Sequence, residues 1–292
     1  MISKEKYYQE QLDSMQDMME RTTAYMEELQ EELNEAKDLL QQKHDELLDS
    51  VNYAAKIQNL LLPSHEFFER HFEDYYWHVN QRDRIGGDFI YYNETDTKIF
   101  IGLFDCTGHG VPGSLLAVMG HRLLEEAFFK NEDQSTLSVM EEVNDGFKQF
   151  FKTNSTDLQD GMEGILCSID KQSREMRYTS VGRPLFVRRG DSWDIFKRSQ
   201  RSIGGRINGQ FEENVFSLAH NDEIFIFSDG LTDQFGGDQD KKFKTRRVLA
   251  GLQNQKHESL SDRLANLETH HKMWMSGWDQ TDDVSFLGVK LK

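Results

Sequence analysis

Hydrophobic residues recur in a seven-residue pattern from the start of the chain to Leu62, and this stretch contains neither Gly nor Pro. If Leu12 takes heptad position a, the later a positions are Met19, Met26, Leu33, Leu40, Leu47, Ala54 and Leu61. The corresponding d positions are Tyr8, Met15, Thr22, Leu29, Ala36, Lys43, Ser50 and Ile57. A seam of about seven heptads exceeds the three to four that indicate a coiled coil. The pattern therefore predicts a coiled-coil and linker helix over residues 1–62.

The predicted helix needs a partner for its hydrophobic seam. At ~1.5 Å per residue it would be about 90 Å long, and a lone helix cannot bury such a stripe on itself. We expect a homodimer through the coiled coil, with a helix packed along its own domain as the alternative. The d layer weakens at Lys43 and Ser50, which is either a switching device or a poor layer. Residues 60–62 are three leucines before Pro63, so some should contact the following domain.

From residue 63 onwards the hydrophobic pattern changes to short apolar runs that alternate with two pairs of amphipathic segments. The runs predict strands over 73–80, 98–104, 164–169, 175–181, 185–189, 193–196, 215–219, 223–227 and 284–290, with one more beginning at Asp88. Helical periodicity covers 111–129, 136–151, 240–254 and 258–275. Short links between the strands favour antiparallel sheets packed face to face with helices outside. We therefore predict an α+β domain over residues 63–292.

Composition narrows the compartment and the partners. The net charge is −17, and an acidic surface repels phosphate backbones, which argues against a nucleic-acid partner. No run approaches the roughly 18 apolar residues of a membrane span, so we expect no membrane insertion by this chain. The two cysteines, Cys106 and Cys167, have no CxxC spacing. Two cysteines without this spacing argue against a disulfide framework or a zinc site, so we expect a reducing, cytoplasmic location.

Four aspartates share one sequence context: Asp88, Asp105, Asp229 and Asp282 each lie at a predicted strand end beside Gly or another acid. An antiparallel hairpin would bring Asp88 and Asp105 to the same end of a sheet. Gathered carboxylates repel one another unless hard cations neutralise them, and all-oxygen ligands favour Mg²⁺ or Mn²⁺ over zinc. Two such ions about 3.5–4 Å apart can activate a shared water for attack on phosphorus. For any single aspartate, the alternative is a turn or cap residue.

Several motifs together resemble one family. They are Ile57-Gln58 with Leu61-Leu62-Pro63, Gly86-Gly87-Asp88-Phe89, Asp105 with Gly108-His109-Gly110-Val111-Pro112, Phe227-Ser228-Asp229-Gly230-Leu231-Thr232, and Asp282-Asp283-Val284-Ser285. The region from about residue 55 to 292 resembles the bacterial SpoIIE/RsbU-type branch of the PPM (protein phosphatase 2C-like) metal-dependent Ser/Thr phosphatases. Residues 82–90 are most similar to SiaA-type members.

The resemblance implies a fold, a site and a substrate. The fold would be an αββα sandwich, and Asp88, Asp105, Asp229 and Asp282 would be the catalytic residues that hold two Mn²⁺ or Mg²⁺ ions. Asp105 would bridge the ions, and the carbonyl of Cys106 is a further candidate ligand. The substrate would be a phosphoserine or phosphothreonine on a STAS-domain protein of the anti-sigma-factor-antagonist type. The coiled-coil linker would regulate the reaction.

For each of the other candidate residues near the motifs, the sequence allows two interpretations of its role. Arg82 and Arg84 are candidates for binding the substrate phosphate, or they are solvated loop residues. His109 either donates a proton to the leaving group or is a turn residue. Asp233 either helps to hold a third ion or caps a turn. Many family members have a small residue in place of Cys106 and Ala in place of Gly113, and neither change removes a side-chain ligand.

Two other classes of function were weighed. A cysteine-based phosphatase needs Arg six positions after its nucleophile, but Pro112 and Ser173 stand six after Cys106 and Cys167, so this mechanism is rejected. The remaining alternative is a catalytically weak, phosphatase-like scaffold that binds a phosphoprotein in a signalling complex. Loss of a ligand aspartate would favour the scaffold, and all four aspartates are present.

Overall fold

A computed structural model of the chain describes residues 4–130, 135–153, 160–196, 199, 202–205, 210–237, 240–255 and 257–292. Internal contacts divide the chain into two compact units, Met1–Tyr53 and Ala54–Lys292. The predicted domain boundary at residue 62 lies inside the second unit and stays a prediction.

The described residues of the first unit form part of one long helix, α1, which spans Lys4–Gln58 and ends inside the second unit. Hydrophobic side chains at the heptad positions are exposed, among them Leu12, Met15, Met19, Met26, Leu29, Leu33, Leu40 and Leu47. The predicted long helix is therefore confirmed. Its pairing with a second copy as a coiled coil stays a prediction, and the exposed seam is the surface that such a pair would bury.

The second unit is built from two five-stranded antiparallel sheets. The first sheet has the strand order β1-β12-β9-β6-β7 and comprises β1 (Phe72–Asn80), β12 (Val284–Leu291), β9 (Glu223–Phe227), β6 (Leu185–Arg189) and β7 (Ser192–Phe196). The second has the order β2-β3-β4-β5-β8 and comprises β2 (Phe89–Glu94), β3 (Lys98–Cys106), β4 (Met162–Asp170), β5 (Glu175–Val181) and β8 (Glu213–Ser217).

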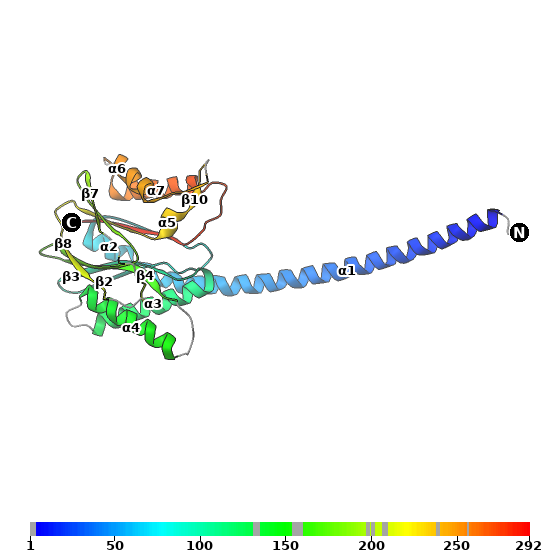
Figure 1. Cartoon of the computed structure of the whole chain (residues 1–292), viewed down its shortest axis with the longest axis horizontal. Helices are drawn as coiled ribbons and strands as arrows, with labels where there is room; N and C mark the ends of the chain where they lie inside the picture. Colours follow the sequence, from blue (N-terminus) through cyan, green and yellow to red (C-terminus); the bar gives the residue numbers. More distant parts are fainter. Residues whose placement is uncertain are drawn as a thin grey trace. The chain divides into compact units, whose positions relative to one another are not determined.

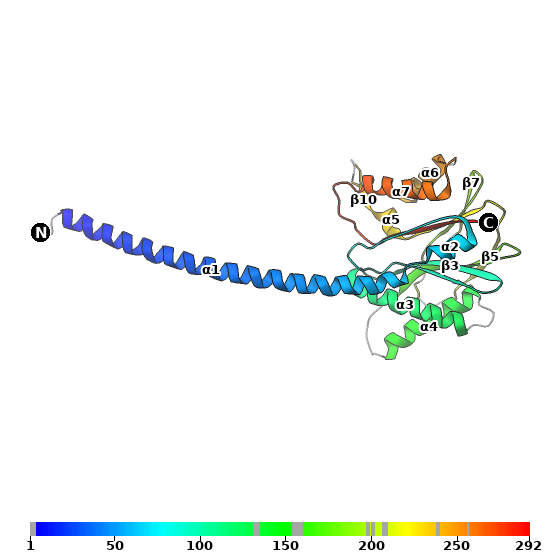
Figure 2. The same ribbon diagram turned by 180° about the vertical axis from the view of Figure 1, so that it is seen from behind.

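Helices cover the outer faces of both sheets, as Figures 1 and 2 show from opposite sides. Helices α3 (Gly110–Lys130) and α4 (Thr136–Thr153) pack on the second sheet, where their apolar side chains join those of β2, β3 and β4. Helices α6 (Thr245–Asn254) and α7 (Leu260–Trp274) pack on the first sheet. The predicted α+β class, with two antiparallel sheets between layers of helices, is confirmed.

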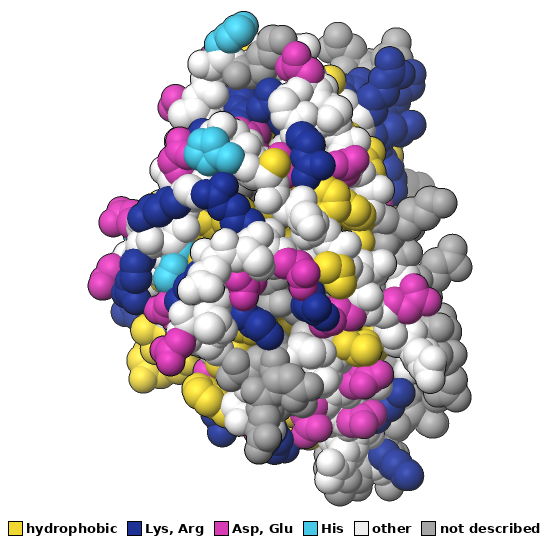
Figure 3. All heavy atoms as spheres, turned by 90° about the vertical axis from the view of Figure 1, so that its left-hand side faces the viewer, with side chains coloured by type: hydrophobic (Ala, Val, Ile, Leu, Met, Phe, Trp, Pro, Cys, Tyr) yellow, Lys and Arg dark blue, Asp and Glu magenta, His cyan; other side chains and the backbone are white. Residues whose placement is uncertain are grey.

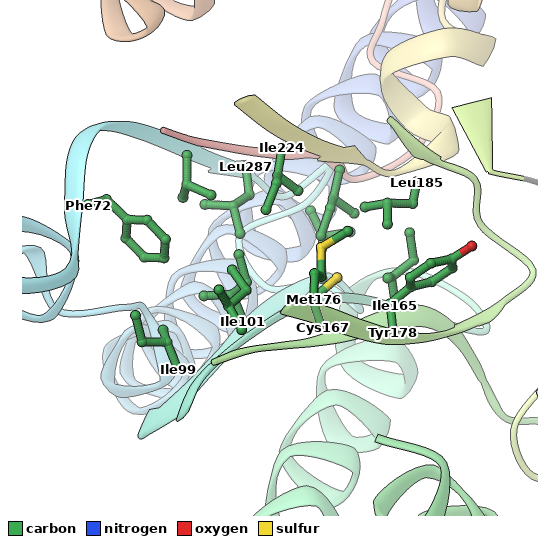
Figure 4. Close-up of a cluster of buried hydrophobic side chains, with 14 of the residues drawn as sticks. Phe72, Ile99, Ile101, Ile165, Cys167, Met176, Tyr178, Leu185, Ile224 and Leu287 are labelled. Carbon is green, nitrogen blue, oxygen red and sulfur yellow. The ribbon is translucent and has the colours of Figure 1, made fainter. Parts of the chain in front are cut away.

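The main hydrophobic core lies between the two sheets. Figure 4 shows Ile101, Ile165 and Cys167 of the second sheet opposite Ile224 and Leu287 of the first. All five side chains are buried. Because alternate residues of each strand point inward, the apolar runs of the sequence become the two inner faces of the sandwich.

Some elements differ from the prediction. The predicted strand 215–219 is β8, which begins and ends two residues earlier. The predicted helix 240–254 begins only at Thr245, because residues before it form a small hairpin between β10 (Phe235–Gly236) and β11 (Lys241–Lys242). The short helices α2 (His65–His71) and α5 (Asp229–Asp233) were not predicted, since neither is long enough to show a helical period.

The last residues of α1, from Ala54 to Gln58, belong to the second unit. After Gln58 the chain forms one 3₁₀ turn, η1 (Asn59–Leu61), and Leu62 is extended before Pro63, as a residue that precedes proline prefers. Leu61 and Leu62 are half-buried, whereas Leu60 is 81% exposed. Since η1 contacts β2, the expectation that some of the leucines contact the domain is confirmed.

The surface carries charges of both signs. On the face shown in Figure 3, Lys and Arg side chains lie among Asp and Glu, and several Lys and Arg side chains adjoin one another at the upper right. Among the described helices, none has the length and hydrophobicity to cross a membrane.

Candidate functional site

The pairing of β2 with β3 brings two of the four aspartates together. Phe89 lies opposite Phe104 in this antiparallel pair, so Asp88, just before β2, stands next to Asp105 near the end of β3. The predicted hairpin geometry is confirmed. The fold thus delivers both carboxylates to one end of the second sheet, without help from the helices.

The other two aspartates come from neighbouring strands of the first sheet. Phe227 at the end of β9 pairs with Phe286 near the start of β12, so Asp229 and Asp282 lie at the same sheet end. Ser228 fixes this end, because its N–H donates to the Ser285 carbonyl at 2.8 Å and its hydroxyl accepts the Ser285 N–H at 3.0 Å. The turn after β9 is thereby tied to the turn before β12.

The ends of the two sheets meet at a cavity of about 360 Å³. Its walls are formed by Asp105, Cys106, Thr107, Gly108, His109, Met162, Glu163, Arg183, Ser202, Asp229 and Asp282. Three of the four predicted aspartates thus face one cavity. A larger cavity of about 410 Å³ between α3 and α4 is lined by none of the four, so we assign the functional site to the acidic cavity.

Asp88 lies behind the cavity wall and is only 2% exposed. Burial raises its pKa well above the usual value, and the charges of Asp105 and Asp283 raise it further. The hydroxyls of Ser285 and Ser228 oppose this rise, but within the described residues neither carboxylate oxygen has a partner with full hydrogen-bond geometry. A buried carboxylate without partners is costly unless a cation neutralises it.

Asp283 organises the loop that leads to Asp88. Its carboxylate accepts the backbone N–H groups of Arg82 and Gly87, both at 2.6 Å. Burial raises the pKa of Asp283, while these hydrogen bonds oppose the rise. Asp282, by contrast, is exposed and lines the cavity. The two adjacent acids therefore differ in role: Asp283 shapes the backbone, and Asp282 faces the site.

Arg183, on the turn between β5 and β6, lies among the carboxylates and is 6% exposed. Its Nη2 is 2.5 Å from Oδ2 of Asp105, and its Nη1 is 2.8 Å from Oδ2 of Asp229. Burial raises the pKa of Asp105 to about 7, although the charge of Arg183 opposes the rise. Burial would lower the pKa of Arg183, but Asp105 and Asp229 more than offset this and raise it.

The carboxylates were tested as a metal site. Within the described residues, no group of three or more His, Cys, Asp or Glu side chains has the spacing to hold a metal ion, and the guanidinium of Arg183 lies between Asp105 and Asp229. The chemistry nevertheless fits a hard cation, because the donors are oxygens and Asp88 has two buried, unpartnered ones. The donors therefore fit Mg²⁺ or Mn²⁺, and the contacts of Arg183 with Asp105 and Asp229 are made to one oxygen of each, Oδ2.

The remaining candidates fall into two groups. Cys106 is buried and lines the cavity, and burial raises the pKa of its thiol well above the usual value. His109 also lines the cavity, and its Nδ1 is 2.8 Å from Oδ2 of Asp83. Asp233 is absent from the cavity lining and pairs with Lys242 at 2.7 Å. This contact favours the structural interpretation of Asp233 over a role at a third ion.

The predicted phosphate-binding arginines lie outside the cavity lining. Arg82 and Arg84 are exposed on the loop before Asp88. Sequence reasoning missed Arg183 and Glu163, which do line the cavity. A signal was present, since Arg183 stands between Gly182 and Pro184 immediately after a predicted strand, the same strand-end context that identified the aspartates.

Gly113 allows the backbone around the site to approach closely. A Cβ at this position would lie 2.3 Å from the carbonyl oxygen of Gly108 and 3.2 Å from the nitrogen of Gly87. Helix α3 thus begins directly against the two glycine turns. This contact explains why the chain has Gly here, where many of the proteins it resembles have Ala.

The site is also connected to the end of α1. The Gln58 side chain donates from Nε2 to the Gly86 carbonyl at 2.6 Å, and its Oε1 accepts the Gly86 N–H at 3.2 Å. Gln58 is buried, and Gly86 lies two residues before Asp88. A single side chain therefore joins the last turn of the long helix to the loop that carries a buried site carboxylate.

Comparison with known families gives one match. The family model described as stage II sporulation protein E (SpoIIE) matches residues 95–292. This range contains Asp105, Asp229 and Asp282 together with Arg183. A search of curated proteins gave no match.

Solved structures share the fold. The SiaA-PP2C domain of Pseudomonas aeruginosa is 24% identical with a TM-score of 0.79, over 86% of this chain and 99% of that domain. The SpoIIE phosphatase domain with a regulatory fragment, from Bacillus subtilis, is 17% identical with a TM-score of 0.61, over 76% of this chain and 64% of that one. The RsbU and RsbW domains of a Mycobacterium tuberculosis protein are 17% identical with a TM-score of 0.60, over 75% and 60%.

Proposed function

The chain belongs to the SpoIIE family of PP2C-like domains, and on that basis we propose that it is a metal-dependent protein serine/threonine phosphatase. The observation that carries the proposal is the acidic cavity, where Asp105, Asp229 and Asp282 line the wall and Asp88 lies buried beside Asp105. Carboxylates concentrated in this way need cations, and cations beside a cavity can bind a phosphate group.

Two Mn²⁺ or Mg²⁺ ions would be held by Asp88, Asp105, Asp229 and Asp282, with the Cys106 carbonyl as a further ligand. When bound, these ions supply a water of lowered pKa and neutralise charge on the phosphate. The chain's own residues do the rest: Asp283 holds the loop before Asp88 through two backbone N–H groups. His109 lines the cavity, with its Nδ1 2.8 Å from Oδ2 of Asp83, and on this position we propose that it gives a proton to the leaving oxygen.

We propose a STAS-domain protein phosphorylated on serine or threonine as the substrate. The support is the family together with the matched structure that carries an RsbU and an RsbW domain in one protein. The exposed heptad seam of α1 supports a homodimer, and the hydrogen bonds of Gln58 to Gly86 supply a route by which the dimer could regulate the site.

The function is tested by hydrolysis of a chromogenic phosphomonoester with Mn²⁺. We expect activity that a chelator abolishes, and we expect Asp105→Asn and Asp229→Asn each to lower turnover by orders of magnitude while circular dichroism stays native. Asp96→Asn, at an exposed hairpin position, is the matched control and should keep full activity. Near wild-type turnover in both site variants at saturating Mn²⁺ would refute the site.

The substrate class is tested with the same protein. An intact phosphorylated STAS-domain protein should be hydrolysed with a much higher kcat/KM than a phosphoserine peptide, because a folded partner adds contacts outside the cavity. A chain that binds the phosphoprotein but releases no phosphate with either metal would instead be the phosphatase-like scaffold.

A further inference from the structure

The acidic cavity contains one guanidinium. Four of its lining side chains are carboxylates, those of Asp105, Glu163, Asp229 and Asp282, and among the described lining residues Arg183 is the one Lys or Arg. A phosphate dianion entering such a cavity meets strong repulsion unless positive charge faces it. Bound cations would supply part of that charge, and Arg183 is placed to supply more.

Arg183 retains hydrogen-bonding capacity. A guanidinium has five N–H donors. One on Nη2 is directed to Asp105, and one on Nη1 to Asp229. The Nε is 3.3 Å from Oε2 of Glu163 but makes no hydrogen bond within the described residues. These contacts with Asp105 and Asp229 engage two of the five donors, and Nε is buried. One further N–H on Nη1 and one on Nη2 remain, on a side chain that lines the cavity.

The position of Arg183 is fixed by its backbone. The hydroxyl of Ser180 donates to the Arg183 carbonyl, and Gly182 before it has a φ of +76°, which a side chain would strain. Pro184 follows. Because the backbone of this turn is constrained, the direction of the Arg183 side chain is constrained too. The two ion pairs hold its guanidinium group beside the cavity.

We propose that Arg183 binds the phosphate group of the substrate. Asp105 and Asp229 orient the guanidinium, and its remaining N–H donors form a fork to two phosphate oxygens, a geometry that Arg provides and Lys does not. This inference rests on the proposed function and replaces Arg82 and Arg84 as the substrate-binding candidates. Arg183 is therefore a binding residue rather than only a counter-ion for the carboxylates.

The test compares Arg183→Lys and Arg183→Met with Arg189→Met. Arg189, at the end of strand β6, which follows the Arg183 turn, pairs with Asp222 at 2.7 Å and is absent from the cavity lining. With saturating Mg²⁺, inorganic phosphate is titrated by calorimetry and used as an inhibitor. We expect the Lys and Met variants to bind phosphate at least about tenfold more weakly. The Arg189 variant should match wild type, and Mg²⁺ affinity without phosphate should change little in the Lys variant.

Unchanged phosphate affinity in the Arg183 variants overturns the inference. Variants that bind Mg²⁺ more weakly but phosphate as well as wild type also overturn it, because Arg183 would then be only a counter-ion for the carboxylates. If the variants fold poorly, wild-type protein with ¹⁵N-labelled arginine gives an independent readout. Phosphate should shift one guanidinium resonance that Arg183→Lys removes, and no shift contradicts the proposal. Phosphate binding through Arg183 without phosphomonoester hydrolysis would refute the phosphatase function and leave this inference standing.

Discussion

Asp88, Asp105 and Asp283 each lie close enough to other acids that a neighbouring charge raises their pKa: Asp105 and Asp283 act on Asp88, Asp229 on Asp105, and Asp282 on Asp283. Burial is the largest cause of the raised pKa of all three. Arg183 offsets part of this repulsion at Asp105, and backbone N–H groups offset part of it at Asp283. Asp88 has neither kind of partner within the described residues. It is therefore the carboxylate that gains most from a bound divalent ion.

The raised pKa of Asp105 predicts how the stability of the metal-free protein depends on pH. An aspartate with a pKa near 3.8 when unfolded and about 7 when folded holds more protons in the folded state between these values. The free energy of unfolding should therefore fall as pH rises from about 4 to about 7, by up to about 1.4 kcal/mol per pH unit for this group.

Asp105→Asn isolates this contribution, because asparagine stays neutral as protonated aspartate does. In chelator, chemical denaturation should find the variant close to wild type at about pH 3.5 and increasingly more stable than wild type as pH rises to about 7. Asp96→Asn should show no such crossover. If wild type instead gains stability relative to Asp105→Asn as pH rises, the carboxylate is ionised at low cost and the burial argument is wrong.

A buried side chain in the last turn of α1, that of Gln58, contacts the loop before Asp88. Gln58 satisfies both the N–H and the carbonyl of Gly86. A Cβ at Gly86 would lie 2.0 Å from Oε1 of Gln81 and 2.3 Å from Oδ2 of Asp283, so the loop has little room to adjust. A displacement of the helix end is therefore transmitted to the loop that carries Asp88.

Gln58→Ala tests this coupling. Leaving the two Gly86 groups without partners should destabilise the second unit by about 1–3 kcal/mol, and it should weaken Mn²⁺ binding because the loop before Asp88 is less constrained. Asn59→Ala, an exposed neighbour, is the control. Calorimetry with Mn²⁺ and urea denaturation measure the two effects. A variant equal to its control in both would show that the joint does not reach the site.

The sequence predicted most elements because their signals are local. The β2–β3 hairpin has apolar runs joined by a short turn, and from these the shared sheet end of Asp88 and Asp105 was predicted. The role of Arg183 could not be predicted in the same way, because its ion pair with Asp105 joins residues 78 positions apart. The sequence of the Gly-Arg-Pro turn does not indicate which end of which sheet the arginine will lie near. Helix α5, with five residues, is likewise too short to produce a period.

The chain as a whole should be a parallel dimer whose coiled coil sets activity. The seam of α1 is exposed, and its d layer is weak at Lys43 and Ser50, near the joint. With weak layers, two arrangements of the helices would differ in free energy by only a few kcal/mol. A modest signal could then shift the population from one arrangement to the other. Lys43→Leu with Ser50→Leu should tighten the dimer and change turnover.

Deletion of residues 1–50 should give mostly monomer with altered turnover, measured by sedimentation and phosphomonoester hydrolysis. Gln58 and Gly86 remain in this shortened chain, so the effect reports on dimerisation rather than on the joint. A shortened chain with the same particle mass and the same kinetics as the full chain would show that the helix neither dimerises nor regulates.

The strand order determines when a newly made chain can acquire its site. Strand β12 is the last to be translated, yet it lies between β1 and β9 and follows directly after Asp282 and Asp283. Until it emerges from the ribosome, β1 at the sheet edge has no neighbour, and the loop before Asp88 lacks the Asp283 carboxylate that holds it. A nascent chain, or one ended early by a premature stop codon, therefore exposes the long helix without a complete set of site aspartates. If α1 forms the predicted dimer, such a fragment would pair with an intact chain and bring an incomplete set of site aspartates.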